Sequence, residues 1–331
     1  MDLILNIAVF LIASVVVIIS ALGLVKTADI IASVTGWGRV WVGSLLLGGA
    51  TSLPELVTVS SAVHFLGPVE GGNLALGTVF GANMMNISKL TLIIALLGGR
   101  NFFQILSSEQ KYLAAIALGL TIATFFLSII GMDYKWLFLS PATLIVLFLY
   151  VISQRFLMKW SSNATSVQET KSDHSIKWTW SLFLLSAIAV FVAAPFLAIS
   201  ASNLADHTGL GESFIGVLGV ALVTSLPELA STIAAIRMKA PDLAVATIYG
   251  TNAFNIAILG VADGFFPNGS IFGHVSTGSL LACIFAMILG ALGALQIILR
   301  RPIKHFSLFE PSTFTICSIW AIGILLIFNT R

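Results

Sequence analysis

The chain has 331 residues, of which 58% are hydrophobic and only 9% are charged. Soluble domains carry about 25% charged residues, so this composition excludes an ordinary soluble enzyme or binding module and indicates a membrane protein with several spans. The net charge of +2 comes from basic residues scattered between apolar runs, which excludes a basic surface for nucleic acid.

A membrane span needs about 20 mostly apolar residues. Taken in chain order, that criterion predicts ten spans, at 3–25, 39–64, 72–98, 111–131, 135–154, 179–201, 213–237, 242–265, 275–299 and 312–329. The longest polar connection, 155–178, divides the chain into a first half, 1–154, and a second half, 179–331, of five spans each. The expected fold class is therefore an all-α polytopic membrane protein with a linker between two halves.

The basic residues indicate how the chain is oriented, because short cytoplasmic loops carry an excess of Lys and Arg. Most of them follow odd-numbered predicted spans: Lys26, Arg39, Arg100, Lys111, Arg155, Lys159, Lys171, Lys177, Arg237, Lys239, Arg300, Arg301 and Lys304. The opposite side has only Lys135 and Arg331, while Lys89 lies within a span. We therefore expect an integral protein of the plasma (inner) membrane, with both termini outside and the 155–178 linker in the cytoplasm.

Two motifs occur once in each half. The hexapeptide Thr-Ser-Leu-Pro-Glu-Leu occupies Thr51–Leu56 and again Thr224–Leu229. A second motif, with two asparagines three residues apart, occupies Gly81–Ile87 and Gly250–Ile256. Because each half has an odd number of predicted spans, the second copy must cross the membrane in the opposite sense. Inverted repeats of this kind are typical of secondary transporters, whose binding site lies near the midplane between the repeats.

The hexapeptide combines residues that are costly inside a span. Proline in a helix interior removes a hydrogen bond and disturbs the carbonyl four residues earlier, so Pro54 and Pro227 should each loosen carbonyls of their helix. Ser52 and Thr51 lie three and four residues before Glu55 and face the same direction. Each copy therefore offers a carboxylate, hydroxyls and carbonyls, an all-oxygen set that suits hard cations such as Ca²⁺ and Na⁺.

Among the acidic residues, only Glu55 and Glu228 lie deep within predicted spans, whereas Asp263 and the others fall at span ends or in loops. A charged side chain at the bilayer centre costs roughly 2.5–3.5 kcal/mol on insertion scales. Two such carboxylates brought together repel each other unless a cation neutralises them. Competition between one divalent ion, two monovalent ions or two protons for this pair would produce exchange.

The second motif adds a polar face to the third and eighth predicted spans. Residues at every fourth position share that face: Thr78, Ala82 and Asn86 in one copy, and Thr247, Thr251 and Asn255 in the other. Gly77, Gly81, Ala246 and Gly250 have the small-xxx-small spacing that lets helices approach closely. Asn83 and Asn252 would either brace the second and seventh spans or touch an ion. Lys89 is interpreted as a lysine that reaches the membrane surface, with charge compensation as the alternative.

These motifs resemble the α-repeats of the cation/Ca²⁺ antiporter superfamily, and Thr-Ser-Leu-Pro-Glu favours its Na⁺/Ca²⁺ exchanger branch. The resemblance implies a sodium/calcium exchanger-like fold of two inverted five-helix repeats, in which the first and sixth spans slide across the others. It also implies a ligand set. Glu55 and Glu228 would be shared between Ca²⁺ and Na⁺, the carbonyls of Thr51 and Thr224 would coordinate either ion, and the hydroxyls of Ser52 and Ser225 would serve Na⁺. Asn86, Asn255, Thr251, Gly48 and Ala221 match further ligand positions.

The sequence departs from that resemblance at two positions of the second motif. Ala82 stands where the family usually has a serine, and Asn255 stands where some exchangers have an aspartate. We expect a Ca²⁺/Na⁺ antiporter that is no enzyme and needs no cofactor, with the two ions as substrates, the lipid bilayer as surroundings and a monomer as a plausible state. H⁺-coupled or other cation exchange is the alternative within transport, and a cation channel is the alternative from another class. An intramembrane enzyme has no nucleophile or metal set to support it.

Overall fold

The computed structural model describes residues 3–65, 68–131, 133–135, 139–163, 175–207, 222–266, 269–273, 275–303 and 310–330. Its elements are all helical. The first half contains α1 (Leu3–Thr35), α2 (Arg39–Trp41), η1 (Val42–Leu47), α3 (Gly48–Thr51), α4 (Leu53–Phe65), α5 (Pro68–Ile93), η2 (Ile94–Gly98), η3 (Phe102–Gln104), α6 (Gln110–Ile130) and α7 (Pro141–Asn163). The second half contains α8 (Ile176–His207), α10 (Leu226–Arg237), α11 (Pro241–Phe265), η4 (Ile271–Gly273), α12 (Thr277–Leu299) and α13 (Pro311–Phe328).

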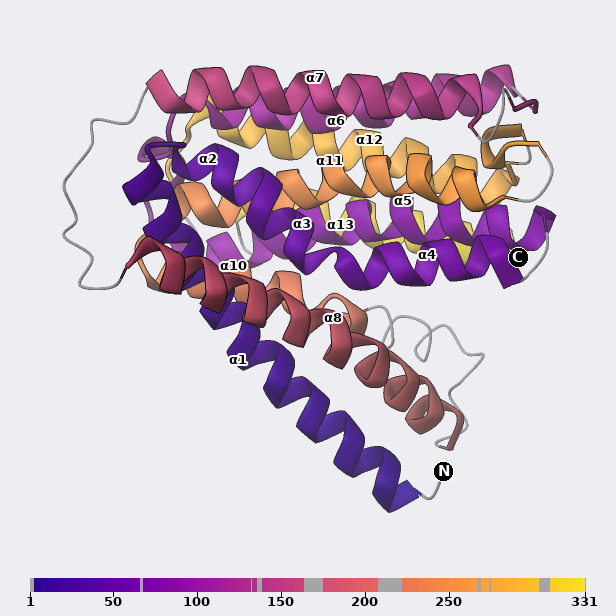
Figure 1. Ribbon diagram of the computed structural model, residues 1–331. Helices are drawn as coiled ribbons and strands as arrows, with labels where there is room; N and C mark the ends of the chain where they lie inside the picture. Colours follow the sequence, from indigo (N-terminus) through magenta and orange to yellow (C-terminus); the bar gives the residue numbers. More distant parts are fainter. Residues whose placement is uncertain are drawn as a thin grey trace.

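Nine of the ten predicted spans are found among the described residues. Eight helices are long and apolar enough to cross a membrane, and Arg39–Thr51 with Leu53–His64 forms a ninth, bent by 50°. The tenth, 213–237, begins outside the described residues, and α10 is its second part. Figure 1 shows both ends of the chain at one side of the bundle, opposite the side where α7 ends and α8 begins. That arrangement agrees with an even number of crossings.

Two helices stand apart from the bundle. α1 and α8 pack side by side and run at an angle to the other long helices (Figure 1). They have 33 and 32 residues, so each is roughly 50 Å long at about 1.5 Å per residue. This length exceeds the ~30 Å hydrocarbon core, and both helices must therefore cross it tilted. One side of the pair reaches the bundle, because α1 contacts α10 while α8 contacts α3 and α4.

The centre of the bundle is formed by the two helices that carry the asparagine motif. In the most apolar 18-residue stretch of each helix, 89% of the residues are buried in α11 and 78% in α5, whereas only 28% are buried in α1. Their neighbours cover them on all sides: α11 contacts η1, α3, α4, α5, α6, α7 and α10, and α5 contacts α4, α12 and α13. Polar side chains on α5 and α11 therefore face protein rather than lipid.

Glycines let the first broken span approach α11 at backbone distance. A Cβ on Gly250 would lie 2.3 Å from the Ser44 Cα, and a Cβ on Gly48 would lie 2.8 Å from the Thr251 nitrogen. The prediction of close approach is thus confirmed for Gly250. For Gly81 it stays a prediction, because no described atom lies within 4 Å of a Cβ at this position. By the repeat, the partner of Gly81 would come from the predicted span 213–237, whose first part lies outside the described residues.

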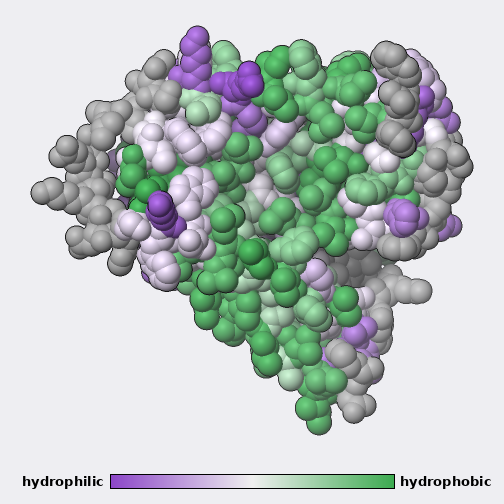
Figure 2. Space-filling view, viewed as in Figure 1, coloured by the Kyte–Doolittle hydropathy of each residue, from purple (hydrophilic) through white to green (hydrophobic). Residues whose placement is uncertain are grey.

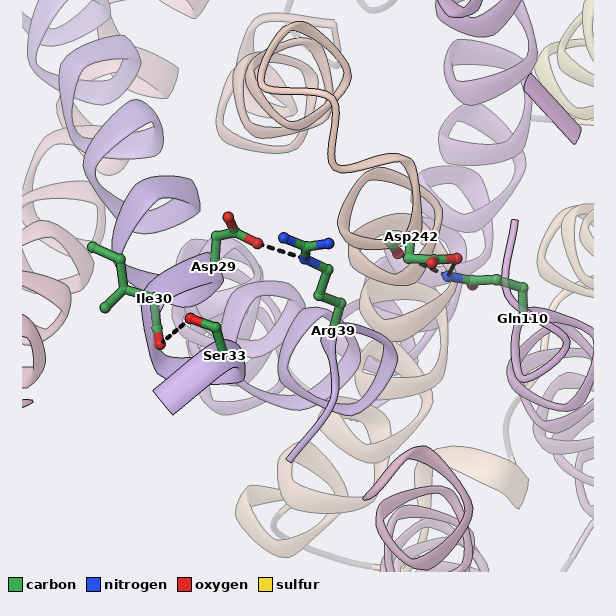
Figure 3. A network of polar contacts seen from close by, with 6 residues as sticks. All are labelled: Asp29, Ile30, Ser33, Arg39, Gln110 and Asp242. Carbon is green, nitrogen blue, oxygen red and sulfur yellow. Dashed lines mark hydrogen bonds and ion pairs between the residues drawn. The ribbon is translucent and has the colours of Figure 1, made fainter. Parts of the chain in front are cut away.

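Polar side chains gather at the two ends of the bundle. Figure 2 shows apolar side chains over the middle of this face and along α1 and α8, with hydrophilic ones toward the ends. At the end where α1 passes into α2, the Arg39 Nε donates to Asp29 Oδ1 at 2.6 Å, and the Gln110 Nε2 donates to Asp242 Oδ1 at 3.1 Å (Figure 3). The second bond joins α6 to α11. This end is the predicted cytoplasmic side.

Candidate cation-binding site

Each hexapeptide breaks its span at the serine. Ser52 has φ −91° and ψ 5°, and Ser225 has φ −89° and ψ 17°, so the two copies adopt the same non-helical conformation. A new helix begins at Leu53 or Leu226, which places the proline in its first turn, where a missing N–H leaves no helical bond unmade. Both prolines were expected within a continuous helix that they would kink. This prediction is wrong, because each span is interrupted at its serine and each proline lies in the first turn of a new helix.

The break places both glutamates in the first turn of a helix. Glu55 lies in the first turn of α4 and Glu228 in the first turn of α10, where the helix dipole favours a negative charge. Glu228 is only 1% exposed, and both of its carboxylate oxygens are buried without a hydrogen-bond partner. The Glu55 side chain as a whole is half-buried, but its Oε2 atom is also buried without a hydrogen-bond partner. The two carboxylates are close enough to repel each other.

Buried carboxylate oxygens without partners are rare, because a buried charge must be paired or must bind a metal. Three such oxygens, from Glu55 and Glu228, meet between the two halves of the chain. This pair of carboxylates is therefore the candidate cation-binding site. The amide oxygen of Asn255 is also buried without a partner, and it is a neutral oxygen of the hard type that Ca²⁺ and Na⁺ prefer.

Hydroxyl groups gather around one carbonyl of the first broken span. The Gly48 carbonyl oxygen accepts from the Ser52 hydroxyl at 2.9 Å, the Thr51 hydroxyl at 3.1 Å and the Thr251 hydroxyl at 3.4 Å. The hydroxyl oxygens of Thr51 and Thr251 are 3.4 Å apart. The Thr51 side chain also lies close to Glu228. Four residues predicted as ligands, from the first broken span and α11, are thus brought together, and the Gly48 carbonyl oxygen accepts the hydroxyl protons of the other three.

The asparagines form a symmetric cluster between α5 and α11. The Asn86 side-chain amide donates to Asn252 Oδ1 at 2.9 Å, and the Asn255 amide donates to Asn83 Oδ1 at 2.9 Å. The Asn83 and Asn252 amides donate to each other's backbone carbonyls at 3.2 and 3.3 Å. Asn83 and Asn252 therefore brace α5 against α11, whereas the sequence predicted either a brace to the second and seventh spans or a contact with an ion. Each also orients the predicted ligand of the opposite helix.

The second hexapeptide is less completely described than the first. The Ser225 hydroxyl donates to the Leu222 carbonyl at 2.9 Å and contacts Met85 Sδ at 3.6 Å, while Thr224 is half-buried. The predicted ligand Ala221 lies outside the described residues. Thr247 lies on the predicted polar face of α11. Its hydroxyl donates to the carbonyl of Leu243, one turn earlier in the same helix, at 2.7 Å, which is the usual local bond of a helical threonine.

Lys89 belongs to this site, contrary to the expectation that it reaches the membrane surface. Its side chain is 8% exposed, and its Nζ is buried without a hydrogen-bond partner. It interacts electrostatically with Glu228 and Glu55. The helical structure continues through η2 to Gly98, which lies roughly 13 Å farther along at about 1.5 Å per residue, beyond the reach of a lysine. The number of residues between Lys89 and the span end already carried this signal in the sequence.

Comparisons with known proteins agree with this geometry. A sequence model described as "Sodium/calcium exchanger protein" matches residues 5–157 and 178–329, most of both halves. The chain belongs to the sodium/calcium exchanger family. It is 28% identical to the inner membrane protein YrbG of Escherichia coli over 76% of this chain and 77% of that protein. It is also 28% identical to the putative antiporter CaxA of Alkalimonas amylolytica, over 66% and 68% of the two chains.

Two further relatives carry exchanger names. The sodium/calcium exchanger MaX1 of Methanosarcina acetivorans is 34% identical over 85 residues, which are 25% of this chain and 24% of that protein. The solved structure of the sodium-calcium exchanger NCX_Mj superposes with a TM-score of 0.75 at 20% identity and covers 98% of this chain and 99% of that chain. The exchanger-like fold, an all-helical polytopic membrane protein, is therefore confirmed. The sodium/calcium exchanger family is a family of transporters.

Proposed function

We propose that this family member is a secondary antiporter that exchanges Ca²⁺ for Na⁺ by alternating access. One observation carries the proposal: Glu55 and Glu228, from opposite halves, bring three buried and unpaired carboxylate oxygens together in a membrane protein. Their two charges match one Ca²⁺, and the same oxygens suit Na⁺. An ion that binds there excludes the other by charge, and such competition is the basis of exchange.

The ligands follow from the positions around the pair. Glu55 and Glu228 would bind either ion directly. The remaining proposed ligands are the carbonyls of Thr51, Thr224, Gly48 and Ala221, the hydroxyls of Ser52, Ser225 and Thr251, and the amide oxygens of Asn86 and Asn255. The contacts around the Gly48 carbonyl support this set, because a cation among those oxygens would replace the hydrogen bonds that they make with one another.

α1 and α8 are the proposed moving elements. They lie across both broken spans, α1 on α10 and α8 on α3 and α4, and carry few polar groups toward the bundle. The small residues Ala13, Ala193 and Ala194 form a separate apolar cluster with Val17 and Leu197, which joins α1 to α8. The two helices would therefore move across the bundle as one unit. Both termini would lie outside the plasma (inner) membrane and the linker inside, as the basic residues predict.

The test is ion flux in proteoliposomes with Na⁺, K⁺ and H⁺ gradients imposed one at a time. Ca²⁺ uptake should follow the Na⁺ gradient alone, and Glu55→Gln or Glu228→Gln should abolish it. Glu70→Gln is the matched control, since Glu70 is also a first-turn glutamate but is exposed. Ca²⁺ uptake at the wild-type rate in either site variant would contradict the proposal. Ion currents far above the turnover of a carrier, without a counter-ion, would indicate a channel instead.

Coupling to H⁺ is the second candidate, and the asymmetry of the asparagine motif favours it. Thr251 contributes a hydroxyl beside Thr51, whereas the equivalent residue on α5 is Ala82, which has none. Asn255 adds no third carboxylate. A site with fewer oxygen ligands holds fewer Na⁺ ions. Ca²⁺ uptake driven by a pH gradient in the absence of Na⁺ would select this candidate.

A further inference from the structure

The cation site contains a positive charge of the protein itself. Glu55 and Glu228 carry two negative charges, and the Lys89 ammonium carries one positive charge that interacts with both. With both carboxylates ionised, the three groups together have a net charge of −1 before any ion binds. Of these three charged groups, the two hexapeptides contain only the carboxylates, because Lys89 lies outside both motifs.

The packing of α5 on α10 holds the lysine in place. Met85 contacts the Ser225 hydroxyl at 3.6 Å, at the break that begins α10. Lys89 lies one turn after Met85 on the same face of α5, and Glu228 lies one turn after Ser225. The two charged side chains are therefore neighbours because the helices that carry them are in register at Met85 and Ser225.

The lysine acts on the glutamates through space. Its Nζ has no hydrogen-bond partner, and neither do the two Glu228 oxygens, so no direct ion pair joins them. A lysine whose role was to satisfy a carboxylate would donate to it directly. Here the carboxylate oxygens stay available to a bound ion, while the ammonium reduces the negative charge that the ion experiences.

We propose that Lys89 is a tethered cation of the transport site, which takes the place of one unit of positive charge that the site would otherwise load. The proposal rests on the proposed exchange function and deepens it. With Ca²⁺ bound the site carries +1, and with a single Na⁺ it is neutral. Lys89 therefore weakens binding of the divalent ion more than binding of the monovalent ion, because the repulsion scales with the charge of the ion.

Equilibrium binding to the purified protein in detergent, measured by calorimetry with Ca²⁺ alone and with Na⁺ alone, tests this role. Lys89→Met should lower the Kd for Ca²⁺ by roughly tenfold or more, and the Kd for Na⁺ by a smaller factor. Lys89→Arg keeps the charge and should stay within about threefold of wild type. Lys177→Met removes an exposed lysine and should change neither Kd. Lys89→Gln replaces Lys89→Met in the measurement if the latter does not elute as a folded species.

Unchanged or weaker Ca²⁺ binding in the folded neutral variant would overturn the proposal. An equal change for both ions would also overturn it, because a lysine that only supports the packing would affect both ions alike. The measurement uses no gradient, so its outcome is independent of the flux test. Wild-type protein without Na⁺-driven Ca²⁺ uptake would refute the exchange function, whereas unchanged Kd values in Lys89→Met would refute the tethered cation alone.

Discussion

Gly250→Ala should damage the crossing of α11 with the first broken span. The added methyl carbon would lie 2.3 Å from the Ser44 Cα and 2.4 Å from the Ser44 carbonyl oxygen, whereas ordinary contacts begin at 3.4 Å. The two backbones must therefore separate by about 1 Å, and no side-chain rotation can relieve the contact. Overpacking of this kind costs about 1–3 kcal/mol, and the better helix propensity of alanine returns up to ~1 kcal/mol. We expect a net destabilisation of about 1 kcal/mol, and no more than about 2 kcal/mol.

The same movement should impair transport, because it draws Gly48 away from Thr251, whose hydroxyl donates to the Gly48 carbonyl at 3.4 Å. The apparent melting temperature in detergent and the rate of Ca²⁺ flux in proteoliposomes should both fall. Gly119→Ala is the control: a Cβ there meets nothing within 4 Å among the described residues, so stability should hold or rise. Wild-type stability and flux in Gly250→Ala would refute the close approach of η1 to α11.

Three further variants test other parts of the structure. Asp263 is fully buried and accepts hydrogen bonds from the Thr143 hydroxyl at 2.6 Å, the Ser270 hydroxyl at 2.9 Å and the Ile271 amide at 2.7 Å. Asp263→Ala leaves these donors unpaired and should lower the free energy of unfolding by roughly 2–4 kcal/mol. A melting temperature within a degree of wild type would contradict this. Asn83→Ala and Asn252→Ala should each cost about 1–3 kcal/mol, and the double variant less than their sum, because the two side chains share one network; strict additivity in a double-mutant cycle would argue against the cluster. Arg39→Met removes an ion pair whose side chains are 50% and 26% exposed, so stability should change by less than about 1 kcal/mol at physiological salt; a larger loss would show that this pair holds α1 in place.

The serine breaks show how far motif reasoning reaches. Proline within an apolar run indicated a disturbed helix, and the repeat placed that disturbance in both halves. Only the structure shows where each helix is interrupted. The new helices begin at Leu53 and at Leu226, so that each proline lies in a first turn. Proline is favoured in the first turn of a helix and costly in its interior, so the observed break is the arrangement that suits both prolines.

Asp263 lies at the end of its span, as predicted, and the structure shows that it is fully buried, because residues 270 and 271 fold back over it as hydrogen-bond donors. Lys89 was expected to reach the membrane surface, yet the helical structure continues beyond it through the rest of α5 and η2 to Gly98. Hydropathy along a chain measures depth in the membrane, and it contains no information about which helix lies opposite a given side chain.

The sequence by itself determined nine of the ten spans among the described residues, the two repeated motifs and the two glutamates that lie deep within spans. These features depend on stretches of about 20 residues, because insertion of an apolar helix and exclusion of charge from lipid are local effects. The tertiary structure decided the asparagine cluster, the α3–α11 crossing and the position of Lys89 beside Glu55 and Glu228. Those features arise where helices distant in the chain meet, and contact between them is set by the packing of whole surfaces rather than by any one segment.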